Sequence, residues 1–143
     1  MSRFIVDTNV VSEGWKDAPD ENVAKWMNRH DYFVPVPVIA ELVDGIERET
    51  NAANQLQLRT QLDVFLSQTL VLEWDVETAF IWGQLRNAPK TKLKADALWD
   101  SLIDAMAVRH NATVVTRNVS DFRHATVFDP WSDLEHLPGK ASA

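Results

Sequence analysis

The segment Phe4-Ile5-Val6-Asp7-Thr8-Asn9 places three apolar residues directly before three polar ones, near the start of the chain. Such a run is typical of a buried strand that stops at a polar loop. A second run, Ala112-Thr113-Val114-Val115-Thr116, is rich in β-branched residues and leads into Arg117 and Asn118. We therefore expect two buried strands that each end in polar side chains.

The sequence between these two runs predicts helices that alternate with short strands. Apolar residues at helical spacing indicate helices near 23–29, 39–46, 58–66 and 95–110, and Asp75 is expected to cap a helix that ends near Arg86. Short strands are expected over 33–38, 70–72 and 127–128, with Pro37 in the first turn of a helix. Connections of this length are too long for hairpins, so the order predicts an α/β sandwich with a central parallel sheet.

The composition indicates a single domain. The chain has 143 residues, of which 45% are apolar, and this is enough to bury a core. The absence of cysteine excludes a disulfide framework, a thiolate zinc site and a cysteine nucleophile. We expect one domain over residues 1–136 and a flexible tail over 137–143. No signal peptide or membrane-length apolar run is found, so a cytoplasmic protein without membrane contact is expected.

The net charge of −7 limits how the chain can meet nucleic acid. A protein that coats a phosphate backbone is normally basic. Carboxylates that hold metal ions add negative charge themselves, so the acidic balance is compatible with a nuclease whose contact with nucleic acid is local and metal-assisted. The same balance leaves room for a basic protein partner.

Four residues are candidates for chemistry because of their place in this pattern. Asp7 ends a buried strand, where a carboxylate is costly unless it is paired or binds a cation. Glu41 lies beside the apolar stripe of its helix and Asp100 lies near a helix start, while Asn118 ends a strand. Each has a purely structural alternative, such as a turn or a helix cap that closes the strand for Asp7, or a solvated first-turn acid for Glu41.

Asp96, Asp100 and Asp104 recur every four residues, which places them on one face of a helix. Like charges at that spacing repel one another, so the stripe is either a solvated face or part of a cation site. Asp100 is the better candidate because it lies nearer the helix start, where Asp7 can face it. Asp104 lies about 6 Å further along the axis, too far to share a cation directly.

Ligands of parallel sheets collect beyond the carboxyl ends of the strands, so the candidate side chains can converge at one edge. Mg²⁺ and Mn²⁺ favour carboxylates, waters and substrate phosphate as ligands. Such ions promote hydrolysis of phosphodiesters. The pattern by itself therefore predicts a metal-dependent phosphodiesterase.

The order of the motifs resembles that of the PIN-domain family. The motifs are residues 4–13, Ile39-Ala40-Glu41-Leu42 with Gly45, the helical segment 100–107, Thr116-Arg117-Asn118 with Asp121-Phe122, and Pro130-Trp131. Within the family, the chain is similar to the VapC and FitB toxins of bacterial type II toxin–antitoxin pairs. The resemblance implies a PIN-like α/β/α sandwich, RNA cleavage with Mg²⁺ or Mn²⁺, a homodimer, and inhibition by a small antitoxin that has a DNA-binding part.

The resemblance also implies roles for particular residues. The first three acids of the family fall on Asp7, Glu41 and Asp100, and its fourth position, often Asp, is Asn118 here. Asp7 and Asp100 would bind the metal directly, and Glu41 would bind it or orient the attacking water. Asn118 would hold a water or a phosphate oxygen. Thr116 matches a hydroxyl that lines the site and would support Asp7 by a hydrogen bond.

Two departures and two alternatives accompany this interpretation. Asn118 weakens the fourth ligand, with Asp121 able to assist it through water, and Asp104 stands where relatives usually have a small residue.

One alternative is a receiver-like α/β binding domain with Asp75 as phosphoacceptor, although such a domain needs a late Lys where this chain has Arg117. The other keeps the nuclease and changes its substrate to DNA or structured RNA.

Overall fold

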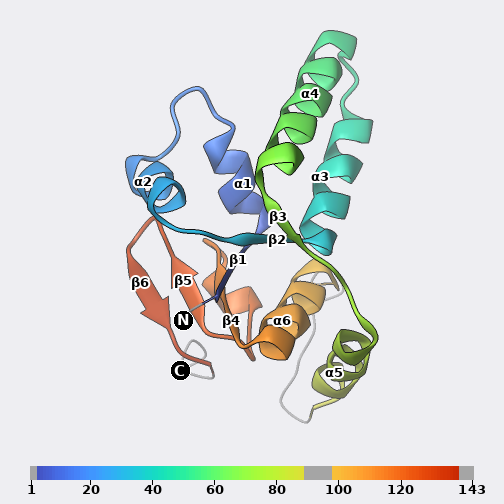
Figure 1. Cartoon of the computed structure of the whole chain (residues 1–143), viewed down its shortest axis with the longest axis vertical. Helices are drawn as coiled ribbons and strands as arrows, with labels where there is room; N and C mark the ends of the chain where they lie inside the picture. Colours follow the sequence, from blue (N-terminus) through green and yellow to red (C-terminus); the bar gives the residue numbers. More distant parts are fainter. Residues whose placement is uncertain (1–2, 89–97, 139–143) are drawn as a thin grey trace.

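Within the part of the chain that the structure describes, six strands form one sheet in the order β3-β2-β1-β4-β5-β6, and six α-helices surround it (Figure 1). This computed structural model describes residues 3–88 and 98–138. The strands are β1 (Arg3–Val6), β2 (Phe33–Pro35), β3 (Leu70–Leu72), β4 (Ala112–Val115), β5 (Val127–Asp129) and β6 (Leu134–His136). The helices are α1 (Thr8–Gly14), α2 (Glu21–Arg29), α3 (Val36–Arg48), α4 (Ala52–Gln68), α5 (Val76–Arg86) and α6 (Leu98–His110), with a short 3₁₀ turn at Val119–Asp121.

The sheet is parallel from β3 to β5, as the sequence predicts. In the pairing of β1 with β4, Val6 lies opposite Val115, so the two strands end at the same level. The strand β6 was not predicted and runs antiparallel to β5. It follows a tight turn in which Asp133 has a positive φ of 59°, a conformation that Asp tolerates better than most residues. The strand is short and mostly exposed, so no apolar pattern marks it.

The helices pack against one another around the sheet, with α3 in contact with both α1 and α6. α1 packs against α2 and α3, while α6 packs against α3, α5 and β4. α3 and α4 stand side by side as a hairpin that projects beyond the sheet (Figure 1). The predicted helix starts are confirmed at two places: Pro37 lies in the first turn of α3, and Asp75 caps α5 by accepting the N–H of Thr78 at 2.8 Å.

The residues of α6 that are buried differ from those on the apolar face that the sequence predicts. Ile103 and Met106 are fully buried as expected, but Trp99 and Leu102 are only partly buried. The buried stretch instead runs continuously through Ala107 and includes Asp104. The predicted start of this helix, 95–97, lies outside the described residues, as does most of the expected tail over 137–143.

The core lies where the central strands meet α1, α3 and α6. Its fully buried side chains include Val6 and Val114 in the strands, Val10 in α1, Val38 in α3 and Ile103 in α6. This packing fixes the carboxyl ends of β1 and β4 against the starts of α1 and α6. Among the described helices, none has both the length and the apolar character needed to cross a membrane.

Candidate active site

Asp7 lies at the carboxyl end of the central strand and at the start of α1. Its backbone N–H extends the sheet by donating to the Val115 carbonyl at 2.9 Å, and its Oδ1 accepts the N–H of Thr8 at 2.8 Å. A helix that begins at Thr8 takes the place of the predicted polar loop after β1, and Asp7 is its N-cap, so the helix-cap alternative for Asp7 is confirmed. The residue is only 3% exposed.

Thr116 holds Asp7 from the neighbouring strand. Its hydroxyl donates to Asp7 Oδ2 at 2.8 Å, so the predicted hydrogen bond is present. The hydroxyl oxygen of Thr116 itself accepts the side-chain amide of Asn9 at 3.1 Å and the backbone N–H of Asn118 at 3.0 Å. Thr116 is completely buried and links the ends of β1 and β4.

Glu41 reaches the site from α3. One of its carboxylate oxygens accepts the hydroxyl of Thr8, the first residue of α1. The predicted alternative of a fully solvated Glu41 is therefore wrong, because the side chain is partly buried and joined to the residue after Asp7.

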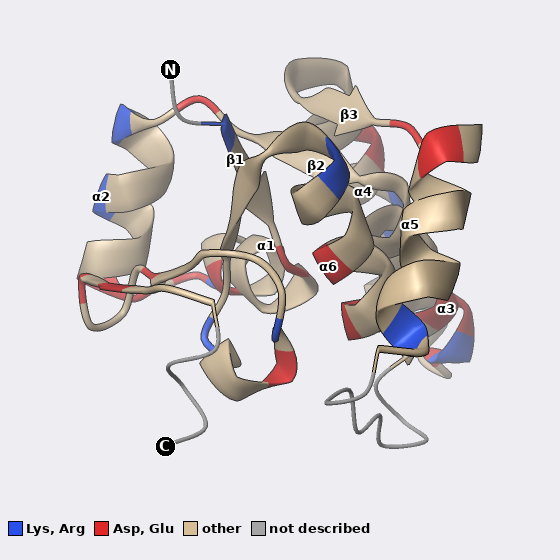
Figure 2. Cartoon of the chain, turned by 90° about the horizontal axis from the view of Figure 1, so that it is seen from below, with Lys and Arg blue, Asp and Glu red and all other residues tan. Residues whose placement is uncertain are grey.

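Asp100 completes a group of acids that interact with one another. Burial raises the pKa of Asp100 to about 7, and the nearby negative charges of Asp7 and Glu41 add to this effect. Burial likewise raises the pKa of Asp7 to about 6, against the lowering effect of its hydrogen bonds from Thr116 and Thr8. The structure thus brings Asp7, Glu41 and Asp100 together, as the convergence of the strand ends predicts. Figure 2 shows acidic segments of α6 near α1 at this end of the sheet.

Asp121 belongs to the same group, although the sequence indicated it only as a helper of Asn118. The negative charge of Asp121 and the contact of its side chain with the carboxyl group of Asp100 both raise the pKa of Asp100. The charge of Asp121 raises the pKa of Asp7 as well. The residue ends the 3₁₀ turn that begins after Asn118, and in the sequence it is marked by its place in the Asp121-Phe122 part of the family motif.

Asn118 has a different place from the one expected of a fourth ligand. Its backbone N–H donates to Thr116, but its side chain is exposed and has no hydrogen bond to a described residue. Asn118 therefore stands at the rim of the site, and Asp121 occupies the place beside Asp100.

Asp104 does not extend the acid group. It is 5% exposed, and its carboxylate accepts the backbone N–H groups of His124 and Ala125. The alternative of a solvated acidic stripe is therefore wrong for Asp104, and Asp96 lies outside the described residues.

The donor set suits a hard divalent cation. Asp7, Asp100 and Asp121 offer carboxylate oxygens, the ligand type that Mg²⁺ and Mn²⁺ prefer. Burial, and after it the repulsion between neighbouring acids, raises the pKa values of Asp7 and Asp100, and a bound cation would offset both effects. Over residues 3–88 and 98–138, no three acids or histidines already form a complete ligand group, so the fit rests on this chemistry and charge.

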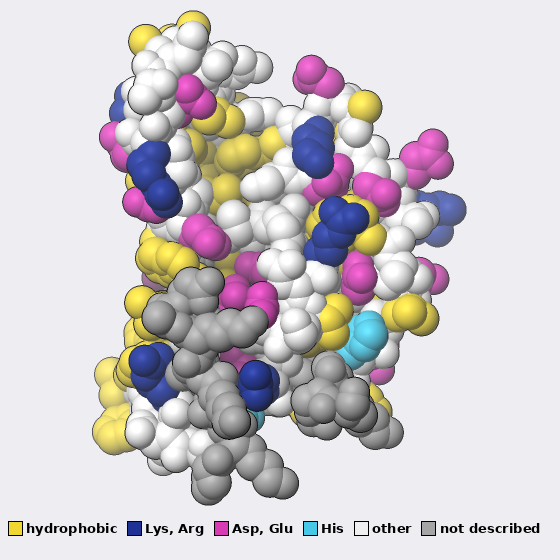
Figure 3. Space-filling model, turned by 180° about the vertical axis from the view of Figure 1, so that it is seen from behind, with side chains coloured by type: hydrophobic (Ala, Val, Ile, Leu, Met, Phe, Trp, Pro, Cys, Tyr) yellow, Lys and Arg dark blue, Asp and Glu magenta, His cyan; other side chains and the backbone are white. Residues whose placement is uncertain are grey.

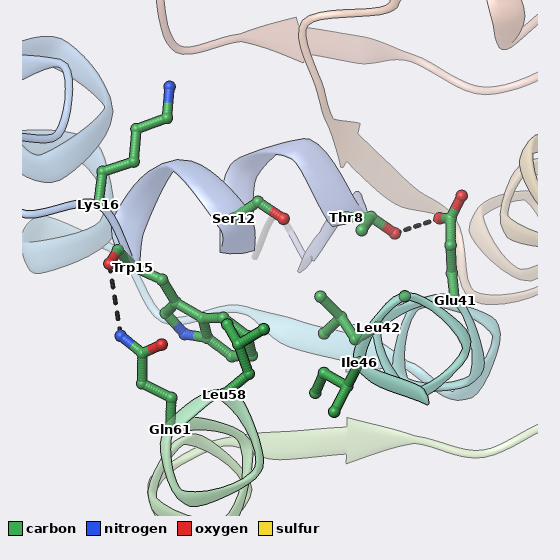
Figure 4. A pocket seen from close by; sticks show the side chains of 10 residues that line it. Thr8, Ser12, Trp15, Lys16, Glu41, Leu42, Ile46, Leu58 and Gln61 are labelled. Carbon is green, nitrogen blue, oxygen red and sulfur yellow. Dashed lines mark hydrogen bonds between the residues drawn. The ribbon is translucent and has the colours of Figure 1, made fainter. Parts of the chain in front are cut away.

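A hollow of about 370 Å³ adjoins the acid group on the α1 side. Thr8 and Glu41 stand at one end, with Trp15, Lys16 and Gln61 at the other (Figure 4). Apolar side chains form its walls, namely Leu42, Ile46 and Leu58. Figure 3 shows an apolar hollow beside the helical hairpin, with acidic side chains at its border.

Asp75 is fully engaged as a structural residue. It accepts the N–H and the hydroxyl of Thr78, and it lies 3.4 Å from the guanidinium of Arg109. These hydrogen bonds hold the pKa of Asp75 below its usual value. Asp75 thus lies beside the last turn of α6, whereas Asp100 lies in the first turn of that helix. The hollow that Asp75 lines is otherwise formed by apolar residues, Trp74, Val76, Ala79 and Phe80, so it is not the acidic pocket that the receiver-like alternative required.

A family model and several known proteins match the chain over most of its length. The model of the PIN domain matches residues 4–127. Toxin FitB of Neisseria gonorrhoeae is 32% identical over 138 residues, covering 91% of this chain and 99% of FitB. VapC ribonuclease Y4jK of Sinorhizobium fredii is 29% identical, covering 90% and 97% of the two chains. The structure of FitAB bound to an IR36 DNA fragment matches with a TM-score of 0.76 and 28% identity, over 93% of this chain and 98% of that chain.

Proposed function

Because the chain belongs to the PIN domain family, we propose that it is a cytoplasmic endoribonuclease that requires Mg²⁺ or Mn²⁺ and acts as the toxin of a toxin–antitoxin pair. The observation that carries this proposal is the meeting of Asp7, Glu41 and Asp100 at the carboxyl edge of the sheet. The names of two relatives, a toxin and a ribonuclease, support the same activity.

Asp7 and Asp100 are the proposed metal ligands. The bound cation would supply Lewis-acid stabilisation of the charge that develops on the phosphodiester. Thr116 fixes the orientation of Asp7 through its hydroxyl, and the N-cap bond from Thr8 fixes the other carboxylate oxygen. The side-chain amide of Asn9 also donates to Oδ2, at 3.5 Å, so three of the four lone-pair directions on Asp7 are used by the protein and one is left for a ligand.

Glu41 is proposed to orient the attacking water and accept its proton. Its carboxylate is held by Thr8 and stands at the end of the hollow nearest the other acids. Asn118, at the exposed rim, is proposed to donate its side-chain amide to a phosphate oxygen. The hollow itself is proposed to take the RNA on one side of the scissile bond.

The decisive experiment incubates the purified protein with single-stranded RNA and Mn²⁺, with and without EDTA. Cleavage that requires the cation and is lost in Asp100→Asn is expected. Cleavage that persists in EDTA, or none with any divalent ion, would contradict the proposal. A parallel reaction on single-stranded DNA of the same sequence tests the alternative substrate.

An antitoxin is the proposed partner. An active ribonuclease in the cell has to be restrained, and a group of acids at the site invites an Arg or Lys from an inhibitor. The similarity to the FitAB assembly supports such a partner. Co-expression with the neighbouring antitoxin gene is expected to restore growth, whereas equal toxicity with and without that gene would contradict the pairing.

A homodimer is proposed as well. α5 exposes two large apolar side chains, Val76 at 72% and Phe80 at 68%, next to Trp74. Exposed apolar surface of this kind is typical of an interface. Light scattering of the purified protein is expected to give the mass of a dimer, and Phe80→Asp is expected to give a monomer. A wild-type protein that is monomeric at micromolar concentration would refute the dimer.

A further inference from the structure

Asp104 is a buried carboxylate that the proposed chemistry does not use. It lies on α6 among fully buried apolar neighbours, including Ile103 and Met106. Burying a charged group is costly unless hydrogen bonds replace its hydration. Here the backbone N–H of His124 lies 3.2 Å from one oxygen, and the N–H of Ala125 lies 3.0 Å from the other. Burial raises the pKa of Asp104 to about 6, against the lowering effects of the His124 charge and of the backbone N–H groups, and such bonds are stronger when the carboxyl group is ionised.

Asp104 binds the backbone at His124 and Ala125, and this segment follows shortly after Asp121, the residue that lies beside Asp100. Asp121 ends the 3₁₀ turn, and only Phe122 and Arg123 separate it from His124. Phe122 is 3% exposed and packs in the core, which also restrains this segment. Two acids one turn apart on α6 therefore contact both ends of one short segment: Asp100 contacts Asp121, and Asp104 contacts the backbone at 124–125.

We propose that Asp104 is a positioning residue, which clamps the backbone at His124 and Ala125 and thereby keeps Asp121 beside Asp100. The proposal depends on the proposed function in one respect only, namely the purpose for which Asp121 is held beside Asp100. The clamp itself is a statement about the backbone of residues 121–125.

Direct cation binding is a poor alternative for Asp104. Both of its oxygens already accept N–H groups, and its carboxylate lies within the protein interior. An apolar residue at the same place would fill space but could not bind the backbone. The polar bonds, rather than the volume of the side chain, are therefore the feature that the test has to separate.

The first experiment measures hydrogen exchange of backbone amides in Asp104→Ala and Asp104→Asn, without metal or RNA. Faster exchange is expected at His124 and Ala125, and also at Asp121 and Phe122, whose N–H groups close the 3₁₀ turn. Asp104→Asn keeps one acceptor oxygen and should restore part of the protection. Asp129→Ala is the matched control, because Asp129 also binds a backbone N–H, that of Trp131 at 2.9 Å, but is the last residue of β5 and lies outside the segment 121–125.

The second experiment is a double-mutant cycle on RNA cleavage. Asp104→Ala is expected to lower kcat/KM about 10- to 100-fold, the range typical of residues that orient a ligand. In an Asp121→Ala background, the same change should have less than about a twofold effect, because its target is already gone.

The two readouts separate the possible failures. Unchanged exchange at 121–125 in both Asp104 variants would overturn the clamp. Independent, multiplicative losses in the cycle would show that Asp104 does not act through Asp121 and would also overturn the proposal. A wild-type protein that does not cleave RNA would refute the proposed function, while the exchange data would still decide whether the clamp exists. If Asp104→Ala does not fold, Asp104→Asn carries both measurements.

Discussion

Thr116 donates its hydroxyl hydrogen to Asp7 across 2.8 Å and so joins the ends of two neighbouring strands, 109 residues apart in sequence. The bond is possible because β1 and β4 are in register, with Val6 opposite Val115 one residue earlier. The same hydroxyl oxygen accepts the N–H of Asn118. One buried side chain therefore sets both the orientation of the proposed metal ligand and the path of the loop that follows β4.

Replacing this hydroxyl tests how much the site depends on it. Thr116→Val keeps the shape but leaves Asp7 and the Asn118 N–H without their partner. We expect a loss of about 1–3 kcal/mol in the free energy of unfolding, from the unsatisfied groups. Cleavage should fall about 10- to 100-fold. Thr116→Ser, which restores the hydroxyl, should recover most of the activity, and a Thr116→Val protein as active as wild type would contradict this role.

Removing a proposed ligand should have a larger effect than removing its support. Asp7→Asn and Asp100→Asn keep the size of the side chain but remove its charge, so we expect cleavage to fall below detection in both variants. Circular dichroism should show that each is folded. Asp63→Asn, an exposed acid on α4, makes the same chemical change away from the site and should retain full activity. Equal losses in all three variants would point to a general effect of charge instead.

How well the position of each of these residues could be predicted depends on the sequence pattern around it. Asp7 and Thr116 end strands that are buried on both faces, and an apolar run followed by a polar residue is visible in sequence. Because parallel strands end at the same edge, their meeting could be inferred without coordinates. The start of α1 at Thr8 could not, since the same Asp-Thr-Asn segment is equally typical of a turn.

The residues that sequence misplaced depend on contacts made far along the chain. Asp104 follows Asp100 by four residues, a spacing that is also typical of a solvated helix face. Its burial is possible because the backbone at His124 and Ala125 folds against α6 and donates hydrogen bonds to it. Asp121 lies in a 3₁₀ turn without hydrophobic periodicity, so no pattern fixes the direction of its side chain. The antiparallel strand β6 is short and exposed, and its turn depends on the positive φ of Asp133.

The raised pKa values of Asp7 and Asp100 predict how stability changes with pH. Each pKa lies above the ordinary value of 3.8, at about 6 and about 7. Between pH 4 and pH 7 the folded state therefore binds more protons than the unfolded chain, and the free energy of unfolding falls as the pH rises. In EDTA, the melting temperature should be lower at pH 8 than at pH 5.

Asp100→Asn should remove part of this pH dependence. Asp100 is partly exposed, so solvent screening limits the gain at pH 8 to about 1 kcal/mol. Adding Mn²⁺ at pH 8 should raise the melting temperature of the wild type but not that of Asp100→Asn. A wild-type protein that is more stable at pH 8 than at pH 5 without metal would contradict the assigned direction.

Gly45 offers a test of whether RNA enters the hollow beside Glu41. It lies in α3 and lines that hollow, and a Cβ atom added there would meet no atom within 4 Å. Glycine inside a helix costs about 1 kcal/mol relative to alanine, so Gly45→Ala should stabilise the protein. Gly45→Leu should instead fill the space and raise KM for RNA severalfold, with a smaller change in kcat.

Gly83 in α5 is the control, because a Cβ there also meets nothing within 4 Å and the residue lies away from the hollow. Gly83→Leu should therefore leave KM unchanged. Wild-type kinetics in Gly45→Leu, with weaker inhibition by the antitoxin, would assign the hollow to the partner protein and not to RNA.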